Sequence, residues 1–81
     1  MIIGKYNYKY FKDGEAVMRN RVKELRWEKN WSQATLSKYS GVRRSTIAAI
    51  EGNVNMNPTV LKALLLAKAL DAPVETIFIL Y

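Results

Sequence analysis

Hydrophobic and polar residues first alternate along the chain and then change to a helical period. In residues 2–12, tyrosines fall on one face of an extended chain and polar residues on the other. The tyrosines are Tyr6, Tyr8 and Tyr10, and the polar residues are Lys5, Asn7 and Lys9. A period of two that is rich in aromatic residues predicts a β-strand. Asp13-Gly14 then breaks the strand, because both residue types favour turns.

Residues 15–29 have the pattern of an amphipathic helix. Met18, Val22 and Leu25 are spaced i, i+4, i+7, which places them on one stripe of a helix surface. Asn30 is a suitable end for this helix, because asparagine tolerates the left-handed backbone conformation that a helix C-terminus often needs.

Two short helices joined by a tight corner are predicted next. Ser32 has the side chain wanted at an N-cap, so a helix should run over residues 33–40. Gly41 ends it and permits a sharp turn, and a second helix should follow over residues 43–51. The apolar residues of the pair are Leu36, Val42, Ile47 and Ile50, with part of Tyr39. Their spacing lets both helices share one patch of core, which predicts a helix-turn-helix.

The last part of the chain predicts a strongly apolar helix over residues 58–70. Asn57 should cap it, and Pro58 suits its first position. Its apolar side chains cover more than one face, so we expect it to be central to the core. They are Val60, Leu61, Leu64, Leu65, Leu66, Ala67 and Leu70. A final short helix is expected over residues 74–79, where the closing FILY also has the composition of a strand.

Composition narrows the possible functions. The 81 residues suffice for one domain with short appendages. Cysteine and histidine are absent, which excludes a disulfide scaffold, argues against a zinc site and removes the commonest general base. The sequence holds no nucleophile–base pair and no glycine-rich phosphate loop, so we expect neither an enzyme nor a cofactor. No apolar run approaches about 18 residues, and the first residues do not read as a signal peptide, so we expect a cytoplasmic, nucleoid-associated protein without a membrane partner.

The charge is distributed unevenly. The net charge is +6, and residues 1–44 carry 11 basic and 4 acidic residues, which gives +7. Residues 45–81 carry 2 basic and 3 acidic residues, which gives −1. A basic first half is typical of a surface turned towards a polyanion, although a high pI also occurs in proteins that bind none. Lys5, Lys9 and Lys12 can form a solvated strand face or an arm that reaches DNA.

Residues 18–78 resemble the lambda-repressor-like helix-turn-helix family, the Cro-and-repressor (XRE) type of DNA-binding domain. The residues that carry the resemblance are Leu25-Arg26, Trp31-Ser32-Gln33, Leu36, Gly41-Val42, Arg44-Ser45-Thr46-Ile47, Ile50-Glu51, Asn57-Pro58 and the stretch from Leu65 to Asp71. The resemblance implies an all-α, compact five-helix domain over residues 15–81. Residues 1–14 would then be an N-terminal extension, as a strand, a dimer contact or an arm.

The resemblance also implies roles for individual residues. The base-contacting residues would be Arg44, Ser45, Thr46 and Ala49, and the phosphate-contacting residues would be Gln33, Arg43, Asn53 and Asn55. Gln33 would also brace the reading helix. A helix that enters the major groove exposes its N-terminal side chains to base edges, and arginine can bind O6 and N7 of guanine together. Arg26 and Glu51 would form a structural ion pair.

Some positions depart from the family pattern. Arg43 stands where a small capping residue is usual, and Ala48 and Ala49 replace residues that are often polar, so base contacts should concentrate at Arg44. Asn53 stands where glycine is common, and Asn tolerates the left-handed conformation. Trp31 replaces a usual leucine, and we expect it to be a larger core residue.

The function predicted from these features is a sequence-specific transcriptional regulator, with repression favoured over activation. It should bind a palindromic operator as a homodimer, with half-sites about 34 Å apart. We expect residues 1–12 or residues 76–81 to make the dimer contact. The alternative is an antitoxin that uses the same fold for autoregulation and an added segment to bind a small toxin or anti-repressor. A phage, a mobile element and a chromosome are all open as the origin of such a domain.

Overall fold

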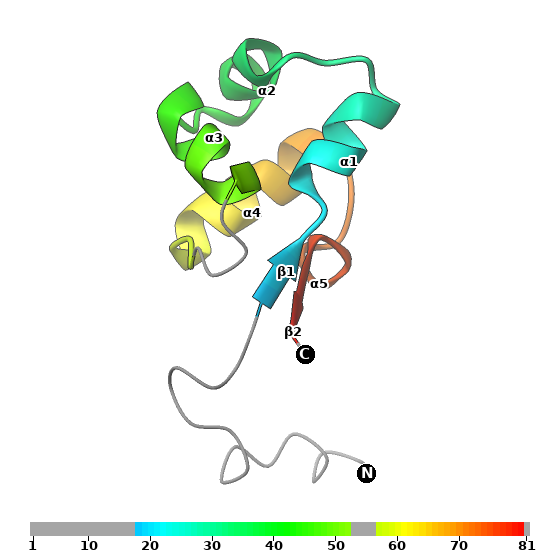
Figure 1. Cartoon of the computed structure of the whole chain (residues 1–81), viewed down its shortest axis with the longest axis vertical. Coiled ribbons are helices and arrows are strands. Elements are labelled where there is room, and N and C mark those ends of the chain that lie inside the picture. Colours follow the sequence, from blue (N-terminus) through cyan, green and yellow to red (C-terminus); the bar gives the residue numbers. More distant parts are fainter. Residues whose placement is uncertain (1–17, 53–56, 81) are drawn as a thin grey trace, which may run out of the picture.

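Five helices and two short strands make up the described part of the chain, residues 18–52 and 57–80, in the computed structural model (Figure 1). In chain order they are β1 (Met18–Asn20), α1 (Val22–Glu28), α2 (Gln33–Ser40), α3 (Arg44–Gly52), α4 (Val60–Leu70), α5 (Val74–Ile77) and β2 (Phe78–Leu80). The predicted five-helix architecture is confirmed. The strand predicted over residues 2–12 and the 1–14 extension lie outside the described residues.

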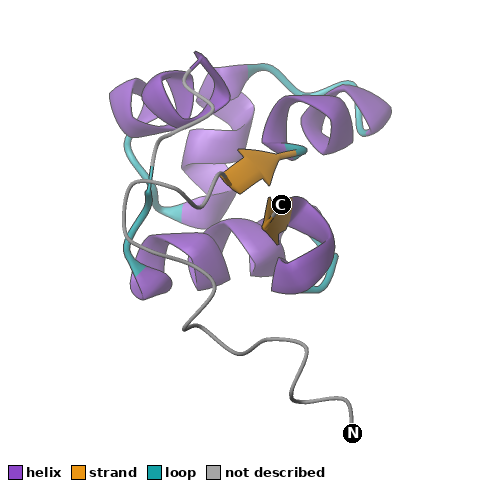
Figure 2. Ribbon diagram, turned by 60° about the horizontal axis from the view of Figure 1, so that its bottom comes forward, coloured by secondary structure: helices purple, strands orange, loops and turns teal. Residues whose placement is uncertain are grey.

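The two ends of the described chain pair as antiparallel strands. β1 and β2 lie side by side with Arg19 opposite Ile79 (Figure 2). The Arg21 N–H continues the pairing by donating to the Ile77 carbonyl at 2.8 Å. The predicted bounds of two helices are therefore wrong. The helix predicted over residues 15–29 begins only at Val22, and the one predicted over residues 74–79 ends at Ile77, because strand pairing takes the backbone groups that a longer helix would need.

Asn20 starts α1 and ties it to α3. Its side-chain oxygen accepts a hydrogen bond from the Val22 N–H at 3.2 Å, which satisfies a free donor of the first helical turn. Its side-chain nitrogen donates to the carbonyl of Ile50 at 2.9 Å. At the other end of α1, Asn30 has a φ of 58°, so its predicted role in ending the helix is confirmed.

The helix-turn-helix corner has the predicted geometry. The Ser32 hydroxyl accepts from the Thr35 N–H at 3.0 Å, and α2 spans the predicted residues. Gly41 follows with a φ of 79°, a left-handed conformation that glycine adopts without the steric cost that a Cβ brings. Within the corner, the Ser37 hydroxyl donates to the Val42 carbonyl at 2.7 Å, and the Val42 N–H donates to the Ser40 hydroxyl at 3.0 Å. These bonds satisfy backbone groups that the turn leaves without helical partners.

One apolar cluster joins the helices. Its buried members are Val22, Leu36, Val42, Ile47, Ile50, Leu66, Ala67, Leu70 and Ile77. They come from all five helices and the turn, so each short helix is stabilised mainly by the neighbours on which it packs. Burial of Leu36, Val42, Ile47 and Ile50 agrees with the helix-turn-helix pattern, whereas Tyr39 is 59% exposed.

The prediction for α4 is partly wrong. Its first residue is Val60, and its cap is Thr59, whose hydroxyl accepts from the Lys62 N–H at 3.2 Å, so neither Asn57 nor Pro58 has the predicted place. Three of the seven apolar residues named in the prediction do not enter the core: Val60, Leu61 and Leu64 are 76%, 66% and 52% exposed. The helix has apolar residues on more than one face, but the small domain covers only the face that holds Leu66, Ala67 and Leu70.

The two glycines of the helix-turn-helix should respond in opposite ways to alanine. Gly41→Ala should lower the free energy of unfolding by about 1 kcal/mol, because a Cβ strains the left-handed conformation even where space is open around it. Gly52→Ala, at the last residue of α3 and also in open space, should leave stability unchanged or slightly higher. Urea denaturation of both variants checks this, and equal losses would contradict it.

Candidate nucleic-acid interface

One face of helix α3 packs on the core, and the opposite face is exposed to solvent. Ile47 and Ile50 are fully buried and anchor its inner face. The carbonyl of Arg43 accepts from the Ile47 N–H at 3.0 Å, so Arg43 directly precedes the first turn. The outer face consists of exposed residues, which are Arg44, Ser45, Ala48 and Ala49. Two adjacent guanidinium groups therefore lie at the N-terminal end of a helix whose position is set by the core.

The predicted contact residues differ in how open they are. Arg43, Arg44, Ser45 and Ala49 are exposed, whereas Thr46 is half-buried and lines a hollow of about 360 Å³ against Leu61 of α4. Thr46 is thus the least open of the four residues predicted to contact bases. Asn53 and Asn55 lie outside the described residues. These base and phosphate contacts stay predictions.

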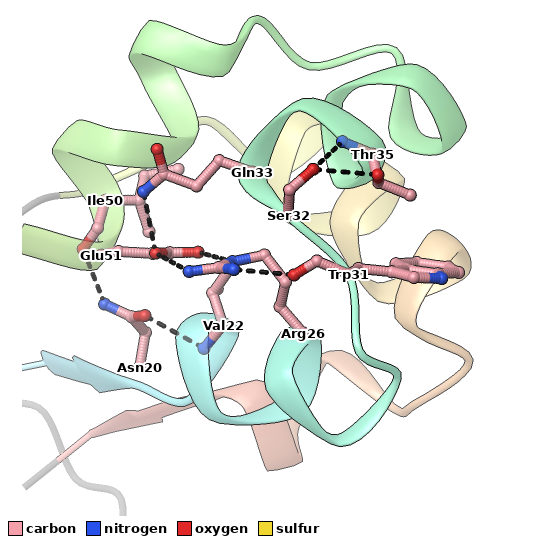
Figure 3. A network of polar contacts seen from close by, with 9 residues as sticks. All are labelled: Asn20, Val22, Arg26, Trp31, Ser32, Gln33, Thr35, Ile50 and Glu51. Atoms are coloured by element: carbon pink, nitrogen blue, oxygen red, sulfur yellow. Dashed lines mark hydrogen bonds and ion pairs between the residues drawn. The ribbon is translucent and has the colours of Figure 1, made fainter.

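The ion pair implied by the family resemblance is present. Arg26 in α1 donates from Nε to one Glu51 carboxylate oxygen at 2.8 Å and from a terminal nitrogen to the other at 3.0 Å (Figure 3). The Arg26 side chain is 8% exposed and that of Glu51 is 3% exposed. Arg26 also donates to the Trp31 carbonyl at 2.8 Å. One buried guanidinium thus joins α1, the segment before α2, and the end of α3.

Gln33 and Asn20 complete this network. The Gln33 side-chain amide donates to Glu51 at 3.0 Å, so the glutamine at the start of α2 also holds α3 (Figure 3). The family resemblance implies that Gln33 reaches a phosphate and braces the reading helix, and its bond to Glu51 provides that bracing. Asn20 had no predicted role, because it was placed inside a longer helix. The signal for Asn20 was its position two residues before the buried Val22, since asparagine readily binds a nearby backbone N–H.

The network sets the charge states of its members. Burial raises the pKa of the Glu51 carboxyl, but hydrogen bonds from Arg26 and Gln33 and the charges of Arg26 and Lys23 outweigh it and leave the pKa below its usual value. The hydrogen bond from Arg26 to Glu51 raises the pKa of Arg26 against the effect of burial. Both side chains are therefore charged over the whole physiological range.

Between residues 18 and 52 and between 57 and 80, no three acidic, histidine or cysteine side chains group in a way that could hold a metal ion. Of the helices described, none has the length and apolar character needed to cross a membrane.

Glu51→Gln should test the network. At neutral pH the variant should lose about 3 kcal/mol of unfolding free energy, because the Arg26 charge stays buried without its counter-charge. Glu51 has a lower pKa in the folded chain than its unfolded value of about 4.3, so its contribution is present above that pH and disappears as pH falls through the folded pKa. Urea denaturation at stepwise lower pH should show the difference between wild type and variant shrinking below about pH 5.

The exposed pair of α1 provides the matched control. Arg21 and Glu24 also form a close ion pair, at 2.7 Å, but their side chains are 38% and 58% exposed. Glu24→Gln should therefore change stability little. A loss as large as that of Glu51→Gln, or a Glu51→Gln difference that does not depend on pH, would contradict this reading of the network.

Comparisons with known proteins agree with this geometry. Residues 22–77 match a family model described as helix-turn-helix. An uncharacterized HTH-type transcriptional regulator of Archaeoglobus fulgidus is 42% identical over 62 residues, which cover 76% of this chain and 86% of the relative. The uncharacterized HTH-type transcriptional regulator YgzD of Bacillus subtilis is 43% identical over 61 residues, covering 75% of this chain and 91% of the relative.

A solved structure shows the same arrangement. The restriction-modification controller protein C.AhdI of Aeromonas hydrophila superimposes with a TM-score of 0.62 at 38% sequence identity. The match covers 68% of this chain and 82% of that protein. Sequence, fold and relatives agree: the chain belongs to the lambda-repressor-like (XRE) helix-turn-helix family of DNA-binding transcriptional regulators.

Proposed function

We propose that this chain is a sequence-specific repressor that reads the major groove of a palindromic operator with the first turn of α3. The observation that carries the proposal is the pair of exposed arginines, Arg43 and Arg44, at the start of a helix anchored by Ile47 and Ile50. A guanidinium at this end of a recognition helix can bind O6 and N7 of one guanine. Because Ala48 and Ala49 follow on the same outer face, Arg44 carries most of the direct reading of bases.

Arg43 and Arg44 have different roles in this proposal. Arg44 is the first residue of α3, whereas Arg43 precedes the helix and lines the hollow towards α4. A side chain at that position reaches the DNA backbone beside the groove rather than a base. Phosphate contacts fix the register of the protein on the duplex and carry no sequence information directly.

A second copy of the chain is part of the proposal, because one short reading helix covers too few bases for high specificity. The exposed side chains of Val60, Leu61 and Leu64 form an unpartnered apolar surface on the first half of α4. Such a surface suits an interface between two copies. From the sequence we expect the dimer contact in residues 1–12 or 76–81. Phe78–Leu80 pairs with β1 of its own chain, which favours α4 over the C-terminal end.

The antitoxin alternative rests on residues 1–14, which lie outside the described residues. The described part of the chain offers no observation that favours it over gene control by DNA binding alone. The likeness to a restriction-modification controller supports gene control as the role of this fold.

Replacing each arginine separately should distinguish recognition of a base from positioning on the DNA backbone. In vitro selection from random duplex DNA supplies the operator, and fluorescence anisotropy then gives affinities for it and for single-base variants. Arg44→Ala should cost about 1–3 kcal/mol on the selected site and relax the preference at one base position in each half-site. Arg43→Ala should weaken all sequences alike and reduce the slope of log affinity against log salt by about 1.

The two arginine variants control for each other, since each removes one positive charge. If Arg44→Ala weakened every sequence equally, or if selection returned no symmetric site, Arg44 would not be the reading residue. Loss of base preference in Arg43→Ala instead would exchange the two roles.

A charged residue placed on the exposed apolar surface of α4 tests whether this surface is the dimer interface. Leu64→Lys should raise the dimer dissociation constant by about 30-fold or more, because it places a charge in an apolar interface and removes a buried leucine worth about 2 kcal/mol. Leu80→Lys is the matched control, since Leu80 is similarly exposed, at 57%, but lies on β2. Sedimentation equilibrium measures both. Dissociation by Leu80→Lys alone would move the interface to the C-terminal strand.

A further inference from the structure

Away from the outer face of α3, the described residues enclose a second hollow. It has a volume of about 410 Å³ and is lined by Trp31, Tyr39, Ser40, Leu65, Lys68 and Ala69. We call it the Trp31 hollow. Its size is at the lower end of the range for ligand sites in proteins, and it is large enough for one big side chain. None of the exposed residues of α3 lines it, and the Trp31 ring points away from Gln33 and Glu51 (Figure 3).

Aromatic rings form one wall of the Trp31 hollow. The ring centroids of Trp31 and Tyr39 are 4.9 Å apart with an interplanar angle of 30°. Tyr39 is 59% exposed, so its ring presents apolar area that a partner can cover. Leu65 and Ala69 of α4 contribute apolar surface opposite. An apolar side chain inserted here would be enclosed by rings on one side and by aliphatic groups on the other.

Lysines surround this apolar wall. The ammonium group of Lys29 lies 5.2 Å from the centroid of the Trp31 ring, and that of Lys38 lies 5.8 Å from the centroid of the Tyr39 ring. Lys68 lines the hollow itself, and none of its six lining residues is acidic. Three cations around one apolar depression complement an anionic partner, because opposite charges across an interface steer binding and fix its register.

The same contacts argue against a nucleobase as the occupant. Bases bind aromatic platforms by stacking on an open ring face. Here the Trp31 and Tyr39 rings lie against each other with a tilt of 30°, and a lysine ammonium group lies over each ring. The space that stays open is the depression beside the rings, which fits an inserted side chain rather than a stacked base.

We propose that the Trp31 hollow binds an acidic segment of a partner protein, which inserts one aromatic or large aliphatic side chain between Tyr39 and α4 while its carboxylates meet Lys29, Lys38 and Lys68. The site uses α2 and α4 and leaves the outer face of α3 open. The chain can therefore hold this partner and DNA at the same time, and the inference does not depend on which bases α3 reads.

The chain provides its own probe for this site. It has two tryptophans, Trp27 and Trp31, so Trp27→Phe leaves Trp31 as the single fluorophore. Trp27 is 59% exposed, and its replacement should not affect folding. In this background we would titrate the peptide acetyl-DEDFEDE-amide and follow Trp31 emission. We expect saturable binding. Replacement of the peptide's phenylalanine by alanine should weaken binding about tenfold or more, because the variant peptide buries less apolar surface in the hollow.

Variants of the full chain locate the site. Lys68→Glu and Tyr39→Ala should each weaken the acidic peptide about tenfold, through like-charge repulsion and loss of apolar contact. Lys62→Glu is the matched control, because it reverses one charge on the same helix outside the hollow, and it should change affinity less than twofold. Circular dichroism checks that each variant is folded.

Four results would overturn the proposal. They are the absence of a saturable change in Trp31 emission, equal binding of the reversed-charge peptide acetyl-KRKFKRK-amide, equal losses in Lys62→Glu and Lys68→Glu, and saturable binding of single-stranded oligo-dT that Tyr39→Ala abolishes while the acidic peptide does not bind. The last result would make the hollow a nucleic-acid site. DNA binding by α3 is measured separately, so a failure here leaves the proposed regulator unaffected.

Discussion

The buried ion pair between Arg26 and Glu51 fixes the orientation of α3 on the core. It joins the first helix to the end of α3; Arg26 also donates to the Trp31 carbonyl, and the Glu51 carboxylate also accepts from Gln33. Removal of two charges from water is costly unless each has hydrogen-bonding partners, and this network provides them. Hydrophobic packing of Ile47 and Ile50 holds α3 against the core, but this interaction is non-directional. The ion pair adds direction, so the outer face of α3 keeps a fixed orientation.

Local chemistry made the middle of the chain predictable. Ser32 as a cap, Gly41 in the left-handed conformation and the spacing of Leu36, Ile47 and Ile50 each act within a few residues, so the pattern alone gave α2 and nearly all of α3. The ends of the chain failed because their structure depends on distant partners. Met18–Asn20 is helical by its apolar spacing but pairs with Phe78–Leu80, about sixty residues away, and tertiary context overrides local preference there.

Burial was harder to predict than helical structure. The apolar run of α4 predicts a helix, and the helix is present, but the pattern does not say which apolar face a small domain leaves uncovered. Val60, Leu61 and Leu64 stay exposed because the described chain has no further element to pack on them. The site residues divide in the same way. Arg26, Glu51, the exposed Arg44 and the bracing role of Gln33 follow from the family pattern, whereas the structural use of Asn20 depends on contacts across the fold.

Three surfaces of this small domain thus differ in chemistry. They are the two arginines at the start of α3, the exposed apolar residues on the first half of α4, and the Trp31 hollow with its lysines. The proposed gene control depends on the first of these surfaces, where Arg44 would bind a guanine directly. A double-mutant cycle tests it, with Arg44→Ala in the protein and 7-deazaguanine, which lacks N7, at each guanine of the selected operator. We expect a coupling free energy of about 1 kcal/mol or more at one guanine per half-site. Additive losses at every guanine would show that Arg44 does not contact a base.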